Sequence, residues 1–300
     1  MALTGDINKR RAAKKVENQA RQNSEYLERR MKPAQKRIVF FGGVYSNYLA
    51  LEALFEDLNE RGVQSLYCLG DLGAFGPFPD RSCEMLRIAG IPCVQGNYDN
   101  SVGNGLADCQ CGYTDPRDNY FARLSYNYTF RHTSNENKAW LKSLPAVARI
   151  QIGRYQALLC HGSPRKTNEF LWESTTSDAF LNWLFEKYEA DIIVATHTGL
   201  HWHREPSPGK HFINCGAIGR PPNDGETTVV YAVVSIGGPD TPDEKCLNVE
   251  FIRLAYDHAR LARDMDLERL PNEFIETIRT GWWTTCNEIL PAKERARGIY

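Results

Sequence analysis

Four polar side chains follow apolar stretches of the chain, and together they could hold a metal ion. Asp71 follows SLYCLG, Asn97 follows IPCVQG, His161 follows QALLC and His197 follows DIIVAT. Runs of four to six apolar residues bounded by glycine are typical of buried strands. Because open α/β sheets bind ligands at the carboxyl ends of their strands, we expect these side chains to converge. One carboxylate, one amide and two imidazoles suit a divalent ion such as Zn, Mn or Fe.

The elements that position these residues alternate between strand and helix in the first hundred residues. RIVFF (37–41) predicts a strand, and apolar residues at helical spacing from 51 to 58 predict a helix that begins after Asn47 and ends at Gly62. SLYCL then gives a second strand, so this order predicts a right-handed parallel unit. A helix over about 80–89 leads to a further strand, IPCV.

Residues 100–146 interrupt this alternation with a predicted helical insertion. Thr133 and Glu136 have the spacing of a capping box, which predicts a short helix after them. The chain then returns to predicted strands near 148–152 and 156–160, a helix near 177–188 and the strand DIIVA. Three later apolar runs have no helix between them, and we expect them to form an antiparallel second sheet: 211–215, 227–236 and 247–254. Two helices are predicted in the tail, over 257–269 and 272–280.

Charge separates the N-terminus from the rest of the chain. Residues 1–37 carry 11 basic and 4 acidic residues, and the remainder carries 25 and 33. Residues 1–36 therefore predict a polar, basic arm that is helical or disordered, with a main domain over 37–255 and a helical appendage over 256–300. The arm or the tail could dock a protein partner or a second copy of the chain.

Composition excludes several function classes. The formal net charge of −1 gives no specific signal for nucleic acid, and no apolar run of 18 residues predicts a membrane span. The N-terminus lacks the apolar core of a secretory signal. Several of the nine cysteines lie inside strand-like runs, which favours reduced thiols and a cytoplasmic protein.

Six motifs in order resemble the calcineurin-like metallophosphoesterases, particularly their stand-alone bacterial and archaeal phosphodiesterase branch. They are GGVYSN (42–47), GDLGAFGP (70–77), GNYD (96–99), CHGSPR (160–165), THTG (196–199) and NCGAIGRP (214–221). The resemblance covers roughly residues 37–236. It implies an α/β fold, a four-layer α-β-β-α sandwich with mixed sheets, and metal-dependent hydrolysis of a phosphomonoester, phosphodiester or nucleotide.

The departures from the family pattern fall on one of its two metal positions. In the family, two ions share a bridging aspartate, which corresponds to Asp71. The other ligands of the first ion are replaced here, by Gly43, Tyr45 and Gly199. The other ligands of the second ion are all kept, as Asn97, His161 and His197. The resemblance therefore implies one divalent ion per chain rather than two.

The resemblance also suggests catalytic and substrate contacts. Tyr98 replaces the family's catalytic histidine and could donate a proton to a leaving alkoxide, acting with Asp71. Its phenol, with a pKa of about 10, could not act as an imidazolium. Candidate contacts with a phosphorylated small molecule or nucleotide are Arg165, Arg220, Tyr45 and His203, since a guanidinium matches phosphate bidentately.

Several alternatives stay open from sequence. The chain could be a catalytically weak or inactive pseudoenzyme that uses the fold to bind a ligand or partner. It could instead hold a second ion through substitutes drawn from Tyr45, His201, His203, Cys109 and Cys111. Tyr45 and Tyr98 could merely fill space, His201 and His203 could lie in a surface loop, and Cys109 and Cys111 could be ordinary thiols. Trp282 and Trp283 could form a partner site or pack the tail onto the body.

Overall fold

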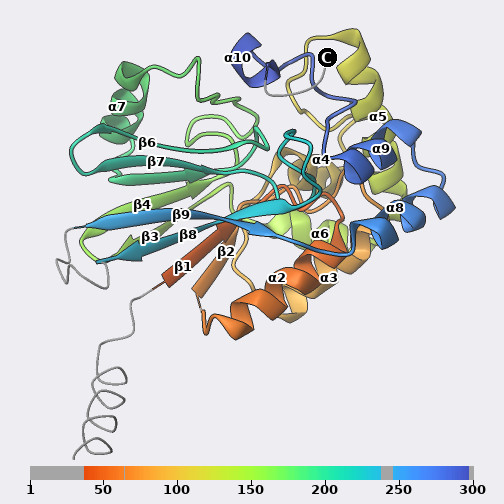
Figure 1. Ribbon diagram of the computed structural model, residues 1–300, viewed down its shortest axis with the longest axis horizontal. Helices are drawn as coiled ribbons and strands as arrows, with labels where there is room; N and C mark the ends of the chain where they lie inside the picture. The colour runs from red at the N-terminus through yellow and green to blue at the C-terminus, as the bar shows by residue number, and fades with distance from the viewer. Residues whose placement is uncertain (1–36, 64, 238–245, 297–300) are drawn as a thin grey trace, which may run out of the picture. The chain divides into compact units, whose positions relative to one another are not determined.

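The computed structural model describes residues 37–63, 65–237 and 246–296. The predicted basic arm lies outside the described residues. The described residues belong to one compact unit that begins at Arg37. Figure 1 shows this unit, in which two sheets form the centre and helices cover them.

The first sheet is mixed. It contains the two parallel strands predicted from RIVFF and SLYCL. Its strand order is β2-β1-β8-β9, with bounds Ser65–Cys68, Arg37–Phe41, Val229–Ile236 and Leu247–Leu254. β1 and β2 are parallel, as predicted, while β8 is antiparallel to both β1 and β9. The predicted strand IPCV is reduced to a single bridge between Cys68 and Cys93.

The second sheet is also mixed, with the order β3-β4-β5-β7-β6. The bounds are Val147–Ile152, Tyr155–Cys160, Ile192–Ala195, Lys210–Cys215 and His201–Ser207. The prediction that the last three apolar runs form one antiparallel sheet was wrong. β7 pairs parallel with β5 in the second sheet, whereas β8 and β9 complete the first. The cause is the 201–207 strand, which turns the chain back so that β7 can enter beside β5.

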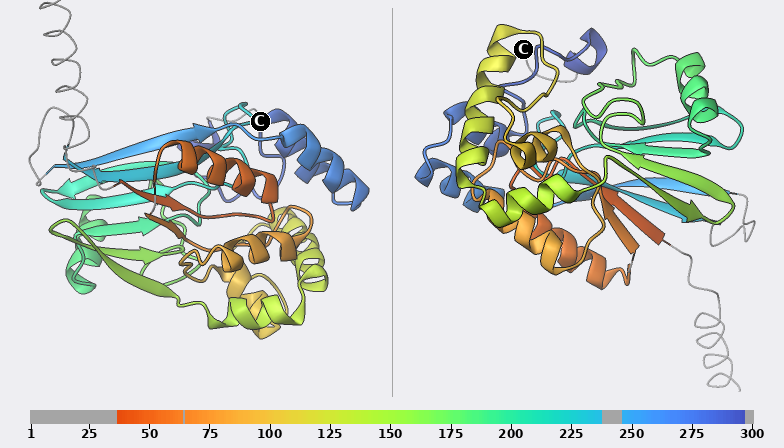
Figure 2. Two further views of the ribbon diagram at one scale, coloured as in Figure 1. Left: turned by 90° about the horizontal axis from the view of Figure 1, so that it is seen from below. Right: turned by 180° about the vertical axis from the view of Figure 1, so that it is seen from behind.

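Helices cover the outer faces of both sheets (Figure 2). Apolar residues of α2 (Tyr48–Glu60) and α3 (Pro79–Ile88) pack on the first sheet, and α7 (Asp178–Lys187) packs on the second. The facing sheets share a core that includes Phe40, Ile213 and Val234. The order of layers is therefore helix, sheet, sheet, helix, as the resemblance implied.

The helical insertion consists of α4 (Asn97–Asn104), α5 (Pro116–His132) and α6 (Asn135–Ser143). The predicted capping residue of α6 was off by one. Ser134 accepts the N–H of Asn137, while the Thr133 hydroxyl donates to the carbonyl of Thr129. The Thr133 side chain is therefore bonded back to the last turn of α5, which ends at His132, and it does not cap α6.

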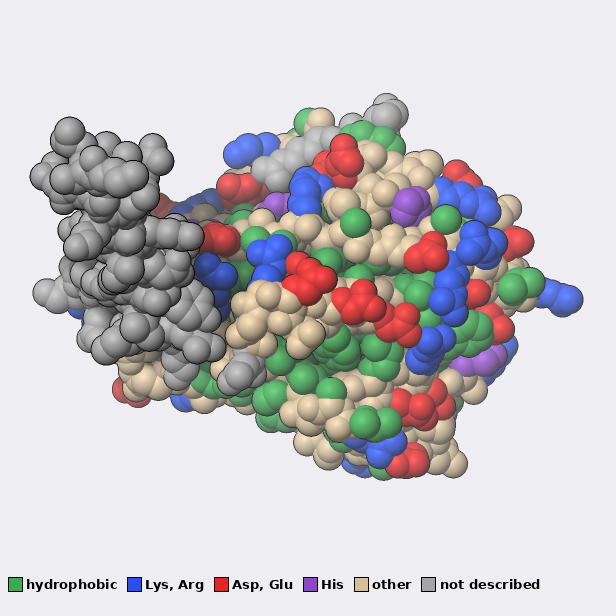
Figure 3. All heavy atoms as spheres, turned by 60° about the horizontal axis from the view of Figure 1, so that its bottom comes forward, with side chains coloured by type: hydrophobic (Ala, Val, Ile, Leu, Met, Phe, Trp, Pro, Cys, Tyr) green, Lys and Arg blue, Asp and Glu red, His purple; other side chains and the backbone are tan. Residues whose placement is uncertain are grey.

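The C-terminal helices are α8 (His258–Leu267), α9 (Asn272–Thr280) and α10 (Ala292–Arg295). α9 ends at Gly281 in the left-handed conformation, as predicted. Its apolar face packs with α8 onto α2 and α5 through residues including Leu49, Phe121 and Phe274. No helix in the described part of the chain is long and apolar enough to span a membrane. On the face in Figure 3, acidic and basic side chains are interspersed.

Candidate metal centre

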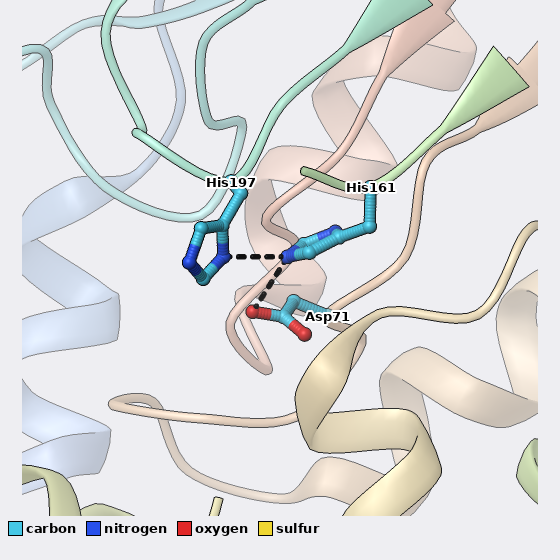
Figure 4. Close-up of side chains that lie close together, drawn as sticks. All are labelled: Asp71, His161 and His197. Carbon is cyan, nitrogen blue, oxygen red and sulfur yellow. Dashed lines mark hydrogen bonds and ion pairs between the residues drawn. The ribbon is translucent and has the colours of Figure 1, made fainter. Parts of the chain in front are cut away.

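Asp71, His161 and His197 meet at the carboxyl ends of β2, β4 and β5 (Figure 4). His161 Nε2 lies 3.2 Å from Asp71 Oδ2 and 3.0 Å from His197 Nδ1. The candidate ligand atoms of the three residues lie within 4.8 Å of one another. All three side chains are buried, and His161 has no exposed surface. The structure thus brings together three of the four residues selected from sequence.

The tautomer of His161 follows from its second nitrogen. Nδ1 lies 2.7 Å from the backbone carbonyl of Leu69, which can only accept a hydrogen bond. Nδ1 therefore carries a proton, and in the neutral ring the lone pair of Nε2 faces Asp71 and His197. A backbone carbonyl behind the imidazole is the usual support of a metal-ligating histidine.

Asn97, the fourth predicted ligand, is the first residue of α4. Its Nδ2 donates to the carbonyl oxygen of Cys109 at 2.9 Å and contacts Cys111 Sγ at 3.4 Å. Its Oδ1 is buried and has no hydrogen-bond partner among the described residues. A buried amide oxygen without a donor is costly unless a cation or water binds it. This orphaned oxygen fits a metal ligand.

Electrostatics couple the three ionisable groups. Burial alone would raise the pKa of Asp71, but the adjacent His161 lowers it below its usual value. Burial alone would lower the pKa of His161, and Asp71 raises it above its usual value. Burial, together with the charge of His161, lowers the pKa of His197 to about 3. At neutral pH His197 is therefore an uncharged imidazole with a free lone pair, the form that binds metals.

Sequence reasoning missed Asp99, which holds the turn around the centre. Asp99 Oδ2 accepts the N–H groups of Asp71 and Gly96, both at 2.8 Å, and Oδ1 accepts that of Leu72 at 2.9 Å. Burial, followed by the charge of Asp71, raises the pKa of Asp99 to about 6. The final aspartate of GNYD was the signal, since an acidic residue in the first turn of a helix commonly accepts backbone N–H groups.

Two aromatic rings lie beside the centre. They occupy the space that a side chain at position 43 or 199 would need, the positions that correspond to ligands of the family's first ion. A Cβ at Gly43 would lie 2.9 Å from Tyr45 Cζ, and one at Gly199 would lie 3.2 Å from Trp283 Cη2. Both glycines have positive φ, which disfavours other residues there. Trp283 is itself fixed, because its Nε1 donates to the carbonyl of Pro221 at 2.7 Å. The tail therefore reaches into the site region.

Arg220 lies against these rings. Its guanidinium carbon is 3.5 Å from the centroid of Trp283 and 5.8 Å from that of Tyr45. The side chain is 5% exposed, and its Nε is buried with no hydrogen-bond partner among the described residues. It lines a narrow pocket with Tyr45 and Phe274. Of the predicted substrate contacts, Arg220 and Tyr45 lie together.

The other two predicted substrate contacts are engaged elsewhere. Arg165 forms an ion pair with Glu169 and lies over the ring of Phe180, 4.9 Å from its centroid. His203 is on strand β6 rather than in a loop, and its Nε2 lies 3.1 Å from His211 Nδ1. Each of these two side chains would have to break its present contacts to reach a substrate.

The Tyr98 hydroxyl faces α5. It donates to Ser125 Oγ at 3.0 Å and approaches the carbonyl of Ala122 at 3.4 Å, while burial raises the pKa of the phenol well above its ordinary value. The backbone N–H of Tyr98 instead supports the centre, because it donates to Asp71 Oδ1 at 2.9 Å. These contacts give Tyr98 a structural part, and the proton-donor role stays a prediction.

The expectation of reduced cysteines needs one correction. Cys109 and Cys111 form a disulfide, while the other described cysteines are free. The pair lies in the loop after α4, where both residues contact the Asn97 amide. Proximity within this tight loop explains the pairing, which the two-residue spacing alone did not reveal.

A layered sandwich of mixed sheets with carboxylate and imidazole groups gathered at its strand ends defines a metallophosphoesterase-type protein. A family model described as the calcineurin-like phosphoesterase superfamily domain matches residues 17–237, and the chain belongs to this superfamily. The expected fold and family are thereby confirmed.

Individual relatives agree with this membership. The uncharacterized protein MJ0912 of Methanocaldococcus jannaschii is 25% identical over 260 residues, covering 81% of this chain and 98% of that protein. A metallophosphoesterase from Sphaerobacter thermophilus has a TM-score of 0.60 at 26% identity, over 82% of this chain and 99% of that one. The hypothetical protein PH1004 of Pyrococcus horikoshii OT3 has a TM-score of 0.67 at 20% identity, with 82% and 98% covered, and shares the fold.

Proposed function

We propose that this protein is a phosphoesterase-type hydrolase that holds one divalent ion, Mn, Zn or Fe, through Asp71, Asn97, His161 and His197. The observation that carries the proposal is that Asn97 Oδ1 is buried without a hydrogen-bond partner among the described residues, while Asp71, His161 and His197 offer ligand atoms close enough for one ion. Oxygen and nitrogen donors in this ratio suit a borderline divalent ion. When bound, such an ion polarises a phosphoryl oxygen and lowers the pKa of a water.

The residues of the chain would divide the remaining work. Asp71 and His161 supply ligand atoms that Asp99 and the Leu69 carbonyl hold in place. Arg220 brings a fixed positive charge beside Tyr45, which suits the phosphoryl group of a small phosphorylated molecule or a nucleotide. Since one ion and one guanidinium neutralise less charge than two ions, turnover would be slower than in two-ion enzymes.

One ion rather than two is supported by what surrounds the centre. Tyr45 and Trp283 fill the adjoining space, and the substitutes considered for a second ion are used otherwise. His203 contacts His211, and Cys109 is bonded to Cys111. Within the described residues, Asp71, His161 and His197 form the cluster of His, Cys, Asp or Glu ligands close enough to hold an ion.

The test is to load the purified chain with Mn, Zn or Fe and to count the bound metal. Hydrolysis of p-nitrophenyl phosphate, bis-p-nitrophenyl phosphate and nucleotides is then measured at each loading. We expect one ion per chain, turnover that follows metal content, and loss of both in His161→Ala. The matched control is His211→Ala, which removes another buried histidine but should retain both properties.

The second candidate function is that of a pseudoenzyme, a ligand- or partner-binding member of the superfamily without turnover. The filling of the adjoining space by Tyr45 and Trp283 favours it, because that space would otherwise admit a second ion. Stoichiometric metal or nucleotide binding with no hydrolysis of any tested ester would support this function. Hydrolysis that tracks metal content would exclude it.

A further inference from the structure

We propose that the Cys109–Cys111 disulfide positions the amide of Asn97 for metal binding, so that reduction of the disulfide weakens the metal site. The inference rests on the proposed metal centre and adds a redox control to it.

The orientation of the Asn97 amide is set by its NH₂ group. Nδ2 has two acceptors in the same short loop, the carbonyl oxygen of Cys109 at 2.9 Å and Sγ of Cys111 at 3.4 Å. A side-chain amide that donates on one side must present its oxygen on the other. The loop therefore directs Oδ1 away from itself, and Oδ1 is the atom left buried without a partner in the described structure.

The loop is held by the bond between the two sulfurs, by hydrogen bonds and by packing of both cysteines in the core. Gln110, between the cysteines, has φ +51°, a conformation rarely adopted by residues other than glycine and asparagine. Its N–H donates to Asp108 Oδ1 at 2.8 Å, and its carbonyl accepts from Asn168 Nδ2 at 2.6 Å. No regular strand or helix holds residues 106–114. Opening the disulfide thus removes the covalent constraint on both acceptors of Asn97.

A small reductant can approach the disulfide. A cavity of about 250 Å³ is lined by the loop and by residues of α5, including Asn119 and Arg123. Both sulfur-bearing residues line this cavity, and they retain 5% and 7% exposure. Six of the seven free cysteines are buried, and burial raises the pKa of Cys286, for example, to about 12. A buried thiol with a raised pKa is a poor nucleophile, so Cys286 does not exchange readily with the Cys109–Cys111 bond.

The redox step balances with a dithiol as the reductant. One dithiol sulfur attacks a sulfur of the pair, the Cys109–Cys111 bond breaks, and a mixed disulfide forms. The second dithiol sulfur then displaces the protein sulfur. The dithiol leaves as its own disulfide, and Cys109 and Cys111 remain as two thiols. Two electrons and two protons pass from the dithiol to the protein.

The experiment compares metal affinity in the two redox states of the full chain, freed of metal by a chelator. One sample is left oxidised, and the other is reduced with a dithiol that is removed by anaerobic desalting. Thiol titration should find two more thiols per chain after reduction. Co²⁺ and Mn²⁺ are titrated by calorimetry, and the Co²⁺ absorption spectrum reports the ligand set. We expect at least a tenfold weaker affinity after reduction and an altered Co²⁺ spectrum.

Three variants sharpen the comparison. Cys109→Ser/Cys111→Ser should bind metal as weakly as the reduced protein and should not respond to the dithiol. Asn97→Asp should also lose the response, because a carboxylate lacks the NH₂ group that the loop holds. Cys246→Ser, at an exposed cysteine outside the loop, should respond as the unaltered chain does. The comparison of redox states in the unaltered chain needs no variant to fold.

Two results would overturn the inference while leaving the metal centre intact. One is equal affinity, within twofold, of the oxidised and reduced chains, and the other is an unchanged thiol count after reduction. Failure of the oxidised chain to bind Co²⁺ or Mn²⁺ at all would instead remove the proposed metal function itself.

Discussion

His161 Nε2 and His197 Nδ1 lie 3.0 Å apart although the two residues belong to different strand ends, those of β4 and β5. Two imidazole nitrogens at this distance share at most one proton. Burial and the charge of His161 lower the pKa of His197 to about 3, so this ring contributes a lone pair. A cation that replaces the shared proton would bind both nitrogens and Asp71 together. The close approach of these two nitrogens therefore favours binding of a metal ion at the centre.

Metal binding should therefore stabilise the fold. A ligand at 100 times its dissociation constant adds about 2.7 kcal/mol to the free energy of unfolding. We expect a rise in Tm on adding Mn²⁺ or Zn²⁺ that disappears in His197→Ala. The pair of His203 and the buried His211 offers the control, since His211→Ala should retain the rise. Differential scanning fluorimetry measures it, and an equal rise in both variants would place the ion elsewhere.

Asp99 should be needed for both stability and metal binding. Asp99→Ala removes the acceptor of three buried N–H groups, of Asp71, Leu72 and Gly96. Leaving such groups unsatisfied costs about 1–3 kcal/mol each, and relaxation of the turn reduces the sum. We expect a loss of roughly 3 kcal/mol in urea unfolding and at least tenfold weaker metal binding. Asp99→Asn keeps one acceptor oxygen, so its stability and metal affinity should lie between those of Asp99→Ala and the unaltered chain. Unchanged stability and metal affinity in both variants would contradict this role.

The Tyr45 ring should make an aspartate at position 43 destabilising. A Cβ at Gly43 would meet the Tyr45 ring at 2.9 Å, at a position where φ is +53°. Gly43→Asp alone should lower Tm, and Gly43→Asp with Tyr45→His should lower it by less than the sum of the single changes. A double-mutant cycle measures this coupling, for which about 0.5–3 kcal/mol is typical of residues in contact. Strictly additive effects would show that Tyr45 does not fill this space.

Tyr98 should act mainly through packing. Tyr98→Phe removes the hydrogen bond to Ser125 and keeps the buried ring, so we expect a loss of about 1 kcal/mol in the free energy of unfolding. Metal affinity and any turnover should stay within a few-fold. A fall in kcat that depends on the pKa of the leaving alcohol would instead identify the phenol as the proton donor.

Asp191, which lies away from the metal centre, should make the stability of the fold depend on pH. Burial alone would raise its pKa, but the N–H of Gln156 at 2.8 Å and Lys210 Nζ at 2.9 Å lower it below its usual value. A carboxyl group whose pKa is lowered in the folded state stabilises the fold at pH values above its unfolded-state pKa, which is about 3.9. That stabilisation is lost as the pH falls through the folded-state pKa. Asp191→Asn should be less stable at pH 7 by no more than about 1 kcal/mol, since the pair is partly exposed.

The Asp191→Asn comparison is made by urea unfolding between pH 2 and pH 7. The stability difference between Asp191→Asn and the unaltered chain should shrink as the pH falls below about 4 and through the lowered folded-state pKa of Asp191. A difference independent of pH would mean that the carboxylate charge is not what Lys210 and Gln156 stabilise.

Elements with strong local signals could be predicted from the residues alone. RIVFF became β1 with its predicted bounds, and α9 ends at Gly281 because only a residue tolerant of positive φ closes that helix readily. The four ligand candidates were found because each follows an apolar run. Three of these runs are strands, β2 in the first sheet and β4 and β5 in the second, and their carboxyl ends meet. The partners of β7 and β8 were not readable, since strand pairing depends on contacts between distant residues.

The surroundings of those ligands depend on contacts between segments that are far apart in the chain. Trp283 is 84 residues from Gly199 along the chain, yet its ring lies where a side chain at Gly199 would begin. Asp99 and the Cys109–Cys111 pair support Asp71 and Asn97 through hydrogen bonds that no spacing rule predicts. The physical reason is the range of the forces involved. Backbone propensity and apolar periodicity act over a few residues, whereas the packing that shapes a buried site joins segments the sequence keeps apart.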